Sequence, residues 1–353
     1  MKKLKVAVLG TGMIVRRAHL PALLGEARVE VAAIYGRNRQ TAGELAAQFK
    51  IPVIAKTVGD AVGVDGLDAV AVALPNFLHR QAAEAAIEAR LHILMEKPLA
   101  ISLEDARAMV DGAAAAGVGF AVNLPQRHRP SMRFVKETIE AGRIGSVQTV
   151  EVSMLRRAGI PGFGTWFTRK QTAGGGVLAD LGPHVIDLAL WLSGSASAAV
   201  TNSRIWRSFG PLGKGLGDWS AHKPVEDPGY QFDVEDRASI SLRSDKGVEI
   251  RCDVAWAYAG PDENRVRVIG EKGGLDYWPE ANGENAPLRY FDANLDPRPM
   301  AVAGDHADLT PAWKQCVSSF IDDIGSGRPL SRGDSALAVH EIIDQVYRRS
   351  SID

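Results

Sequence analysis

KVAVLGTGMIV, residues 5–15, decides the fold, because an apolar strand pattern runs directly into a glycine turn. Gly10 and Gly12 precede a helix-compatible stretch, which is the setting of a dinucleotide-binding turn. Glycine lets the backbone turn tightly and approach a pyrophosphate, whose charge then lies at a helix amino terminus. Val15 stands where the usual fingerprint has its third glycine. We therefore predict coenzyme contacts from Gly10, Gly12, Met13 and Ile14.

The first 122 residues alternate short apolar runs with helical patterns. Near-continuous apolar strands separated by helices are typical of a parallel sheet covered on both faces. Ser102, followed by Asp105 three residues later, predicts the capped start of a helix, and Gly117 predicts its end. The predicted strands are residues 5–9, 29–34, 51–54, 68–74, 91–95 and 117–122.

Beyond residue 125 the runs are longer and alternate, which predicts an antiparallel sheet with one covered face. These runs are residues 146–155, 234–244, 247–258 and 264–270, and helical patterns follow at 311–324 and 335–349. Residues 208–230 predict an ordered surface loop bordering the substrate. With 353 residues, the chain is expected to form two domains, 1–123 and 124–353. The prediction leaves open that the last helix, 335–349, packs back on the first domain.

Composition narrows the class of protein. Lys and Arg total 41 against 42 Asp and Glu, which disfavours nucleic acid as a partner. The amino-terminal apolar run is too short for a signal peptide, and no segment predicts a membrane span. Cys252 and Cys316 offer neither a disulfide framework nor metal-ligand spacing. We therefore expect a cytoplasmic protein with no metal and no membrane partner.

The choice of coenzyme is expected to depend on the residues that follow the second strand. Instead of a carboxylate for a ribose hydroxyl, the sequence has Tyr35, Gly36, Arg37, Asn38 and Arg39. Either arginine is suited to pair with a 2'-phosphate, so NADP is favoured over NAD, with use of both left open. The alternative is that both are solvated charges and that Arg39 only opens the next helix. We include Gly36, Arg37 and Asn38 in the predicted coenzyme site.

Leu74, Pro75, Asn76 and His79 follow the fourth strand, where a doubly wound sheet binds its ligand. Asn76 is placed to contact the coenzyme, although capping of the next helix explains it almost as well.

Two segments carry candidate proton-transfer groups. Glu96, Lys97 and Pro98 follow a buried strand, and Pro98 biases Lys97 toward an extended turn. Residues 174–190, GGGVLADLGPHVIDLAL, are interpreted as a helix behind three glycines, with Asp180, His184 and Asp187 on one face. In that interpretation Asp180 orients the His184 imidazole, and Lys97 and His184 are the acid/base candidates. A metal pair is disfavoured because no further His or Cys clusters there.

The order of these motifs resembles the glucose-fructose oxidoreductase, inositol dehydrogenase and MocA family. The resemblance covers nearly the whole chain. Its motifs are the glycine turn with His19-Leu20-Pro21-Ala22-Leu23, Leu74-Pro75-Asn76 with Leu78-His79, Glu96-Lys97-Pro98-Leu99, Gly142-x-x-Gly145, and Gly174-Gly175-Gly176 with Asp180-x-x-x-His184-x-x-Asp187.

The resemblance implies a fold and a set of roles. It implies an α/β chain with an amino-terminal Rossmann dinucleotide-binding domain and a carboxyl-terminal α+β domain. In the second domain a large, mostly antiparallel open sheet serves as an interface for a homodimer or homotetramer. Lys97, Asp180 and His184 are implied as the catalytic set, which would also touch substrate, with the bond before Pro98 cis or trans. Glu96 and Asn76 are implied beside the nicotinamide ribose.

The resemblance also implies that Asn123 or Arg127 borders the substrate and that Trp166 belongs to the site. Phe167 follows Trp166 where an arginine is common, so loop packing explains Trp166 equally well.

We therefore predict an NAD(P)-dependent dehydrogenase or reductase that acts on a hydroxyl or keto carbon of a sugar, anhydrosugar or cyclitol. Two alternatives remain: a redox-neutral enzyme resembling glycosidases or lyases, and a sensor that binds dinucleotide without catalysis. The presence of Lys97, Asp180 and His184 together argues against the sensor.

Overall fold

The computed structural model describes residues 3–217, 232–282, 286–304, 308–325 and 333–350. The chain forms two compact units, Met1–His128 with Asp308–Leu337, and Arg129–Ala307 with Ala338–Asp353. The sequence predicted the boundary between the two domains after residue 123, and the structure has the boundary between the two units after His128. The return of the chain to the first unit at 308–337 had no counterpart in the sequence pattern.

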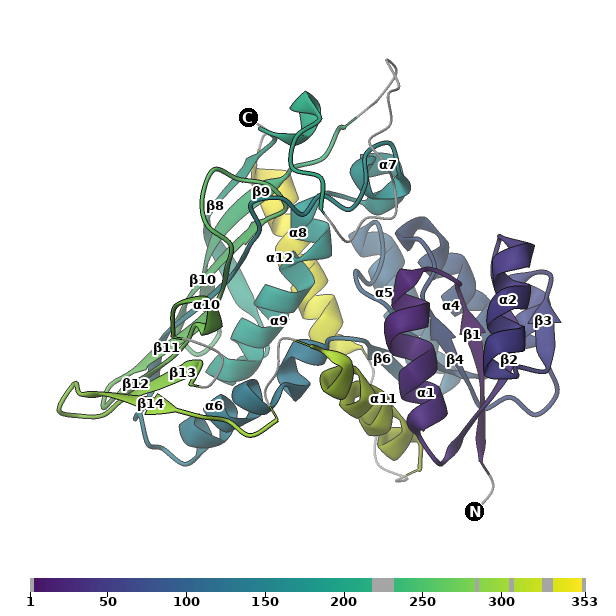
Figure 1. Ribbon diagram of the computed structural model, residues 1–353, viewed down its shortest axis with the longest axis horizontal. Helices are drawn as coiled ribbons and strands as arrows, with labels where there is room; N and C mark the ends of the chain where they lie inside the picture. Colours follow the sequence, from purple (N-terminus) through teal and green to yellow (C-terminus); the bar gives the residue numbers. More distant parts are fainter. Residues whose placement is uncertain (1–2, 218–231, 283–285, 305–307, 326–332, 351–353) are drawn as a thin grey trace. The chain divides into compact units, whose positions relative to one another are not determined.

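A six-stranded parallel sheet organises the first unit (Figure 1). Its strands are β1 (Leu4–Leu9), β2 (Val29–Tyr35), β3 (Val53–Ala55), β4 (Ala69–Val72), β5 (His92–Met95) and β6 (Phe120–Val122). They lie in the order β3-β2-β1-β4-β5-β6. The six strands predicted for this part of the chain are confirmed.

Helices cover both faces of this sheet, as near-continuous apolar strands require. The core on one face includes side chains of η1 (Val15–His19), α1 (Leu20–Gly25), α2 (Arg39–Phe49) and α11 (Thr310–Gly325). On the other face the core includes α3 (Val58–Val62), α4 (His79–Glu88) and α5 (Leu103–Ala116). Ser102 accepts from the Asp105 amide at 3.1 Å, and Gly117 ends α5 with a φ of 68°, as predicted.

The second unit contains an eight-stranded sheet, in the order β14-β13-β12-β11-β7-β10-β9-β8. Its strands are β7 (Val147–Leu155), β8 (Ala198–Trp206), β9 (Arg237–Ser244), β10 (Glu249–Ala255), β11 (Glu263–Gly270), β12 (Gly274–Tyr277), β13 (Leu288–Phe291) and β14 (Pro297–Met300). Neighbouring strands are antiparallel except β7 and β10, which are parallel. The predicted fold class and its mostly antiparallel second sheet are confirmed.

Strand alternation gives this sheet one apolar face. Val152 and Cys252 are buried in the core, whereas Glu151 and Arg251, one residue earlier on the same strands, project from the opposite face. The apolar face packs against α9 (Gly182–Ser193), whose residues are nearly all buried. The other helices of the second unit are α6 (Pro130–Glu140), α7 (Lys170–Ala173), α8 (Val177–Asp180), α10 (Pro279–Asn282) and α12 (Asp334–Arg349). Short helical turns occur in both units. They are η2 (Asn76–Leu78) and η3 (Pro125–His128) in the first unit, and η4 (Trp166–Thr168) and η5 (Gly210–Leu212) in the second.

Most buried side chains of α12 lie in the core of the second unit. Val339, Ile342, Ile343 and Val346 belong to that core, and only the start of the helix, at Ala336, joins a core of the first unit. The helix that returns to the first sheet is α11, which the sequence pattern did not distinguish from α12.

Among the described residues, no single helix has the length and apolar composition needed to cross a membrane. One bent pair, Lys170–Asp180 with Gly182–Ser193, meets those two criteria together, with a bend of 42°. Of the loop predicted at 208–230, residues 218–230 lie outside the described residues. The part before them forms η5 and a bridge between Ile160 and Leu216.

The glycine turn after β1 packs directly against the end of β4. Gly10 has a φ of +134°, and its amide donates to the Tyr35 carbonyl at 2.8 Å. A Cβ at Gly10 would lie 2.2 Å from the Ala73 carbonyl oxygen, whereas a Cβ at Gly12 would meet no heavy atom within 4 Å. The two glycines of one motif therefore face different constraints.

We predict that Gly10→Ala destabilises the protein by about 3 kcal/mol, because it adds both backbone strain and a clash. Gly12→Ala is the matched control and should change stability by less than about 1 kcal/mol. Urea unfolding measures the free energy of unfolding of both variants. Equal values would contradict the conclusion that only Gly10 is sterically required to be glycine.

Candidate active site

The predicted coenzyme turn lies where β1, β2 and β4 end side by side. A Cβ at Gly36 would lie 2.3 Å from the Thr11 side chain, so the segment after β2 packs closely on the turn. Met13 and Gly12 are exposed, and Ile14 packs partly into the core. The space beside Gly12 is open, so no protein atom would obstruct a close backbone approach to a pyrophosphate. The turn thus fits a dinucleotide.

The two arginines after β2 differ in their contacts. Arg39 is the first residue of α2, the position that the alternative interpretation gave it. Its Nη1 also donates to the Ala55 carbonyl. Asn38 caps the same helix by accepting from the Thr41 amide at 3.1 Å. Arg37 is exposed at the end of β2. Of the two, Arg37 is the better candidate for a phosphate contact.

His79 has a structural role that its sequence position did not reveal. The side chain is fully buried, with Nδ1 3.0 Å from the Pro98 carbonyl and Nε2 2.9 Å from the Leu74 carbonyl. Burial lowers the pKa of His79, which favours the neutral imidazole. That His79 contacts the coenzyme stays a prediction, and the contacts observed for its ring are with backbone carbonyls. It connects the loop at Leu74 to the loop at Pro98.

Asn76 is buried in the turn η2, and Pro75 and Leu74 beside it are partly exposed. The N-cap residue of α4 is Leu78, so Asn76 lies two residues ahead of the helix cap.

Glu96 is the centre of a buried polar network in the first unit. Its Oε1 lies 2.7 Å from His19 Nε2 and accepts from Asn123 Nδ2 at 2.6 Å. Burial by itself raises the pKa of Glu96, but the hydrogen bonds from His19 and Asn123 outweigh it, and the pKa lies below its usual value. The carboxylate is therefore ionised and held in one orientation.

Lys97 follows this carboxylate directly. Its amide donates to Glu96 Oε2 at 3.2 Å, its side chain is partly buried, and its bond to Pro98 is cis. The backbone of the candidate base is thus attached to the buried network that β5 carries.

The segment with Asp180 and His184 is not the single helix that its spacing predicted. The helix α8 ends at Asp180 and α9 begins at Gly182. Pro183 has no N–H to donate to the carbonyl four residues earlier, so the helical hydrogen-bond ladder is interrupted. Asp180 and His184 therefore lie on either side of a break between two helices, and both residues are partly exposed, whereas Asp187 is buried.

The three glycines before α8 serve packing within the second unit. A Cβ at Gly175 would lie 1.8 Å from the Tyr347 hydroxyl, and one at Gly176 would lie 2.0 Å from the Glu235 carbonyl oxygen. Gly175 and Gly176 therefore leave room for Tyr347 and Glu235.

The structure also locates the predicted substrate residues. Asn123 belongs to the Glu96 network, and Arg127 lies in η3, partly exposed. Trp166 stacks on Phe167 with ring centroids 3.8 Å apart, so the residue that departs from the family pattern packs against Trp166.

Four residues around these groups escaped the sequence prediction: His19, Glu235, Trp256 and Tyr347. His19 stood within a quoted motif but had no predicted partner. The others carry no local signal, because their contacts join distant parts of the chain.

Two family models match most of the chain. Residues 4–124 match the model of an oxidoreductase family with an NAD-binding Rossmann fold, and residues 132–276 match the GFO/IDH/MocA carboxyl-terminal domain.

Individual relatives are similar over long stretches. D-glucoside 3-dehydrogenase of Escherichia coli (strain K12) is 26% identical, over 98% of this chain and 95% of the relative. Levoglucosan dehydrogenase of Pseudarthrobacter phenanthrenivorans is 31% identical, over 77% of this chain and 67% of the relative. The crystal structure of aldose-aldose oxidoreductase from Caulobacter crescentus, complexed with glycerol, has a TM-score of 0.79 at 25% identity, covering 98% of this chain and 97% of that one.

Proposed function

The chain belongs to the GFO/IDH/MocA oxidoreductase family, and on this premise we propose that it is an NADP-preferring dehydrogenase or reductase acting on a CH–OH carbon of a sugar, anhydrosugar or cyclitol. The observation that carries the proposal is the Glu96 network, which fixes the backbone of Lys97 at the end of β5. That strand belongs to the same parallel sheet as the glycine turn.

The proposed chemistry needs a hydride acceptor and a base for the hydroxyl proton. The bound coenzyme supplies the hydride acceptor. In our proposal Lys97 polarises the reacting oxygen and shares its proton with His184, and Asp180 orients these two groups. Glu96 and Asn76 border the nicotinamide ribose, and Asn123, Arg127 and Trp166 border the substrate.

The names of the relatives support a polyhydroxylated substrate. One is a dehydrogenase of glucosides and another of levoglucosan, an anhydrosugar. Hydroxyl-rich ligands suit a site whose proposed lining is mostly polar or charged.

The experiment that tests the function follows reduction of NADP and of NAD by absorbance across monosaccharides, glucosides, anhydrosugars and inositols. We expect turnover of at least one compound, faster with NADP. Retained coenzyme with conversion of a glycoside but no net reduction would overturn the proposal in favour of redox-neutral chemistry.

Lys97→Ala should lower kcat by at least about 10²-fold, the usual contribution of a positioned acid or base. Coenzyme affinity, measured by fluorescence titration, should stay within a few-fold. Lys56→Ala, which removes an exposed lysine of the same unit, is the matched control. Equal activity of Lys97→Ala and wild type would remove Lys97 from the mechanism.

Arg37→Ala should weaken NADP binding by about 10-fold or more, because a hydrogen bond to a charged group contributes about 1.5–3 kcal/mol. NAD binding should be unchanged. Arg39→Ala is the matched control, since Arg39 donates to the Ala55 carbonyl. Titration of both variants with NADP and with NAD measures the affinities. An equal loss of affinity for NADP and NAD in Arg37→Ala would contradict a contact between Arg37 and the 2'-phosphate.

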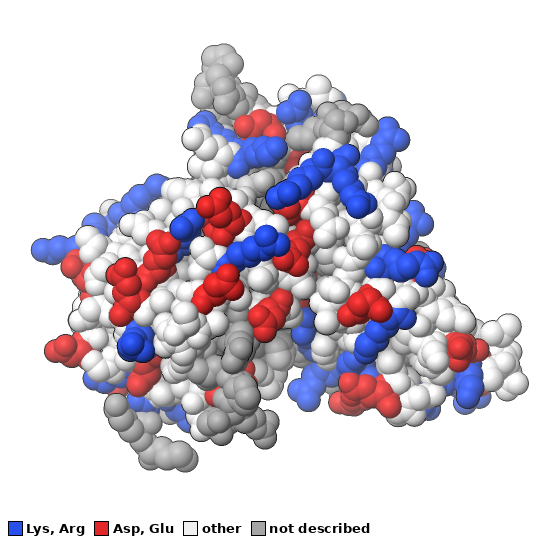
Figure 2. Space-filling view, turned by 180° about the vertical axis from the view of Figure 1, so that it is seen from behind, with Lys and Arg blue, Asp and Glu red and all other residues white. Residues whose placement is uncertain are grey.

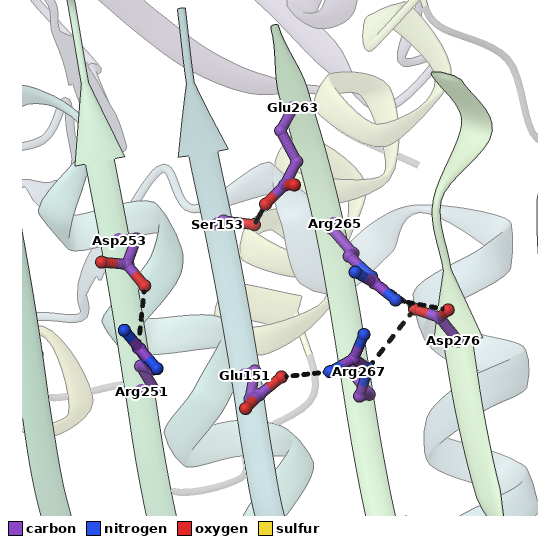
Figure 3. A network of polar contacts seen from close by, with 8 residues as sticks. All are labelled: Glu151, Ser153, Arg251, Asp253, Glu263, Arg265, Arg267 and Asp276. Atoms are coloured by element: carbon purple, nitrogen blue, oxygen red, sulfur yellow. Dashed lines mark hydrogen bonds and ion pairs between the residues drawn. The ribbon is translucent and has the colours of Figure 1, made fainter. Parts of the chain in front are cut away.

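We also propose that a second copy of the chain binds the polar face of the eight-stranded sheet. On that face Arg251, Glu151, Arg267 and Asp276 lie side by side on four adjacent strands and alternate in charge (Figure 3). Glu151 and Asp276 both pair with Arg267, at 2.8 and 3.9 Å. A row that alternates in sign is complementary to itself after a two-fold rotation, which is the symmetry of most dimers.

Charges of both signs are also intermixed on the face of the molecule drawn in Figure 2. An interface made of such pairs is polar, so its strength should depend on salt concentration. This distinguishes it from the apolar interface of an obligate dimer.

Arg267→Glu should dissociate the proposed dimer, because it places like charges along the row. Sedimentation velocity at low and high salt measures the effect, with Lys56→Glu in the other unit as the control. A wild-type chain that sediments as a monomer at low salt, or a dimer unaffected by Arg267→Glu, would contradict the proposed interface.

A further inference from the structure

Asp180 is held by a buried donor from the sheet of its own unit. Its Oδ2 accepts from Trp256 Nε1 at 2.8 Å. Trp256 follows β10 and is fully buried, and its amide donates to the Asp236 carbonyl at 2.8 Å. An indole N–H is a donor only, so this contact suits a carboxylate acceptor. The ring thereby fixes one oxygen of Asp180 relative to the sheet.

The backbone that carries Asp180 is held by a second buried group, the Glu235 carboxylate. Glu235 Oε1 accepts from the amides of Gly176 and Leu178, both at 2.9 Å. Gly176 is the N-cap of α8 and Leu178 lies in its first turn, where a helix leaves its N–H groups without intrahelical partners. Glu235 therefore caps the helix that ends at Asp180.

Tyr347 completes this cap from the last helix of the chain. Its hydroxyl donates to Glu235 Oε1 at 2.8 Å. Burial and the adjacent carboxylate of Glu235 raise the pKa of Tyr347 well above its usual value, so the phenol remains a donor. The contact requires glycine at position 175, because a Cβ there would overlap the hydroxyl.

The helix α8 needs such support, because its own sequence does little to stabilise it. It has four residues, between three glycines and a break at Leu181. A single helical turn is not stable in isolation, and glycine adds backbone freedom that must be removed. The position of Asp180 is therefore set by its tertiary contacts.

We propose that Trp256, Glu235 and Tyr347 are positioning residues that hold Asp180 in place for catalysis. This inference rests on the proposed function, in which Asp180 orients the proton-transfer groups. None of the three needs to touch substrate or coenzyme. Displacement of a catalytic group by about 1 Å costs up to about 10²-fold in rate, so the loss of one of these contacts should appear in kcat.

The test compares Trp256→Phe and Tyr347→Phe with wild type, using NADP and the compound that the substrate panel identifies. We expect kcat to fall about 10- to 100-fold while the Kd of NADP stays within two-fold. Tyr347→Phe is the milder variant, since it removes one hydroxyl and keeps the ring. Tyr290→Phe is the matched control, because it removes a hydroxyl that donates to the Arg143 carbonyl of the same unit at 3.2 Å.

A second measurement needs no substrate. Hydrogen exchange of residues 174–184 should accelerate in Trp256→Phe and Tyr347→Phe and stay unchanged in Tyr290→Phe. Thermal stability measured alongside separates positioning from a structural role, which would lower the melting temperature and leave kcat of the folded enzyme unchanged.

Asp180→Asn distinguishes a failure of the proposed function from a failure of the positioning proposal. Activity equal to wild type in Asp180→Asn would overturn the catalytic role of Asp180 in the proposed function. A large loss in Asp180→Asn, with kcat and exchange unchanged in Trp256→Phe and Tyr347→Phe, would overturn only the present inference.

Discussion

The close approach of Gly10 to the carbonyl of Ala73 is the constraint on which the amino-terminal unit depends. It allows β1 to turn sharply where β4 ends, so the glycine turn, the segment after β2 and the loop after β4 meet at one edge of the sheet. Parallel strands present their carboxyl ends together, and a ligand binds where those ends diverge. A side chain at this one position would separate the elements that form the predicted coenzyme site.

Buried carboxylates organise the rest of both units. Glu96 joins β5 to His19 and Asn123, and Glu235 joins the start of α8 to Tyr347. The next residue, Asp236, accepts from the amides of Ser208, Phe209 and Gly210 and so holds the start of a loop. A buried polar group is costly unless hydrogen bonds satisfy it, so each of these side chains fixes the segments that supply its donors. The two proposed catalytic segments are both built in this way.

The sequence indicated most elements but misjudged how some of them are used. The spacing of Asp180 and His184 suggested one helix, yet Pro183 divides it into two. His79 lay at the expected sheet edge, and its buried ring contacts the backbone carbonyls of Leu74 and Pro98. The strands β8, β12, β13 and β14 were missed, because three of them have four residues each and all lack a long alternating run. Each error arose where a side chain's surroundings, rather than its neighbours in sequence, decided its role.

The sequence by itself determined the parallel and antiparallel sheets, the glycine turn, the cap at Ser102 and the order of the motifs, because hydrophobic period and turn chemistry are local properties. Only the tertiary structure decided the supports of Glu96 and Asp180 and the return of α11 to the first unit. The contacts of His19 with Glu96, Trp256 with Asp180 and Tyr347 with Glu235 span 77, 76 and 112 residues. No periodicity encodes such partners, since they meet only when the core that buries them has formed.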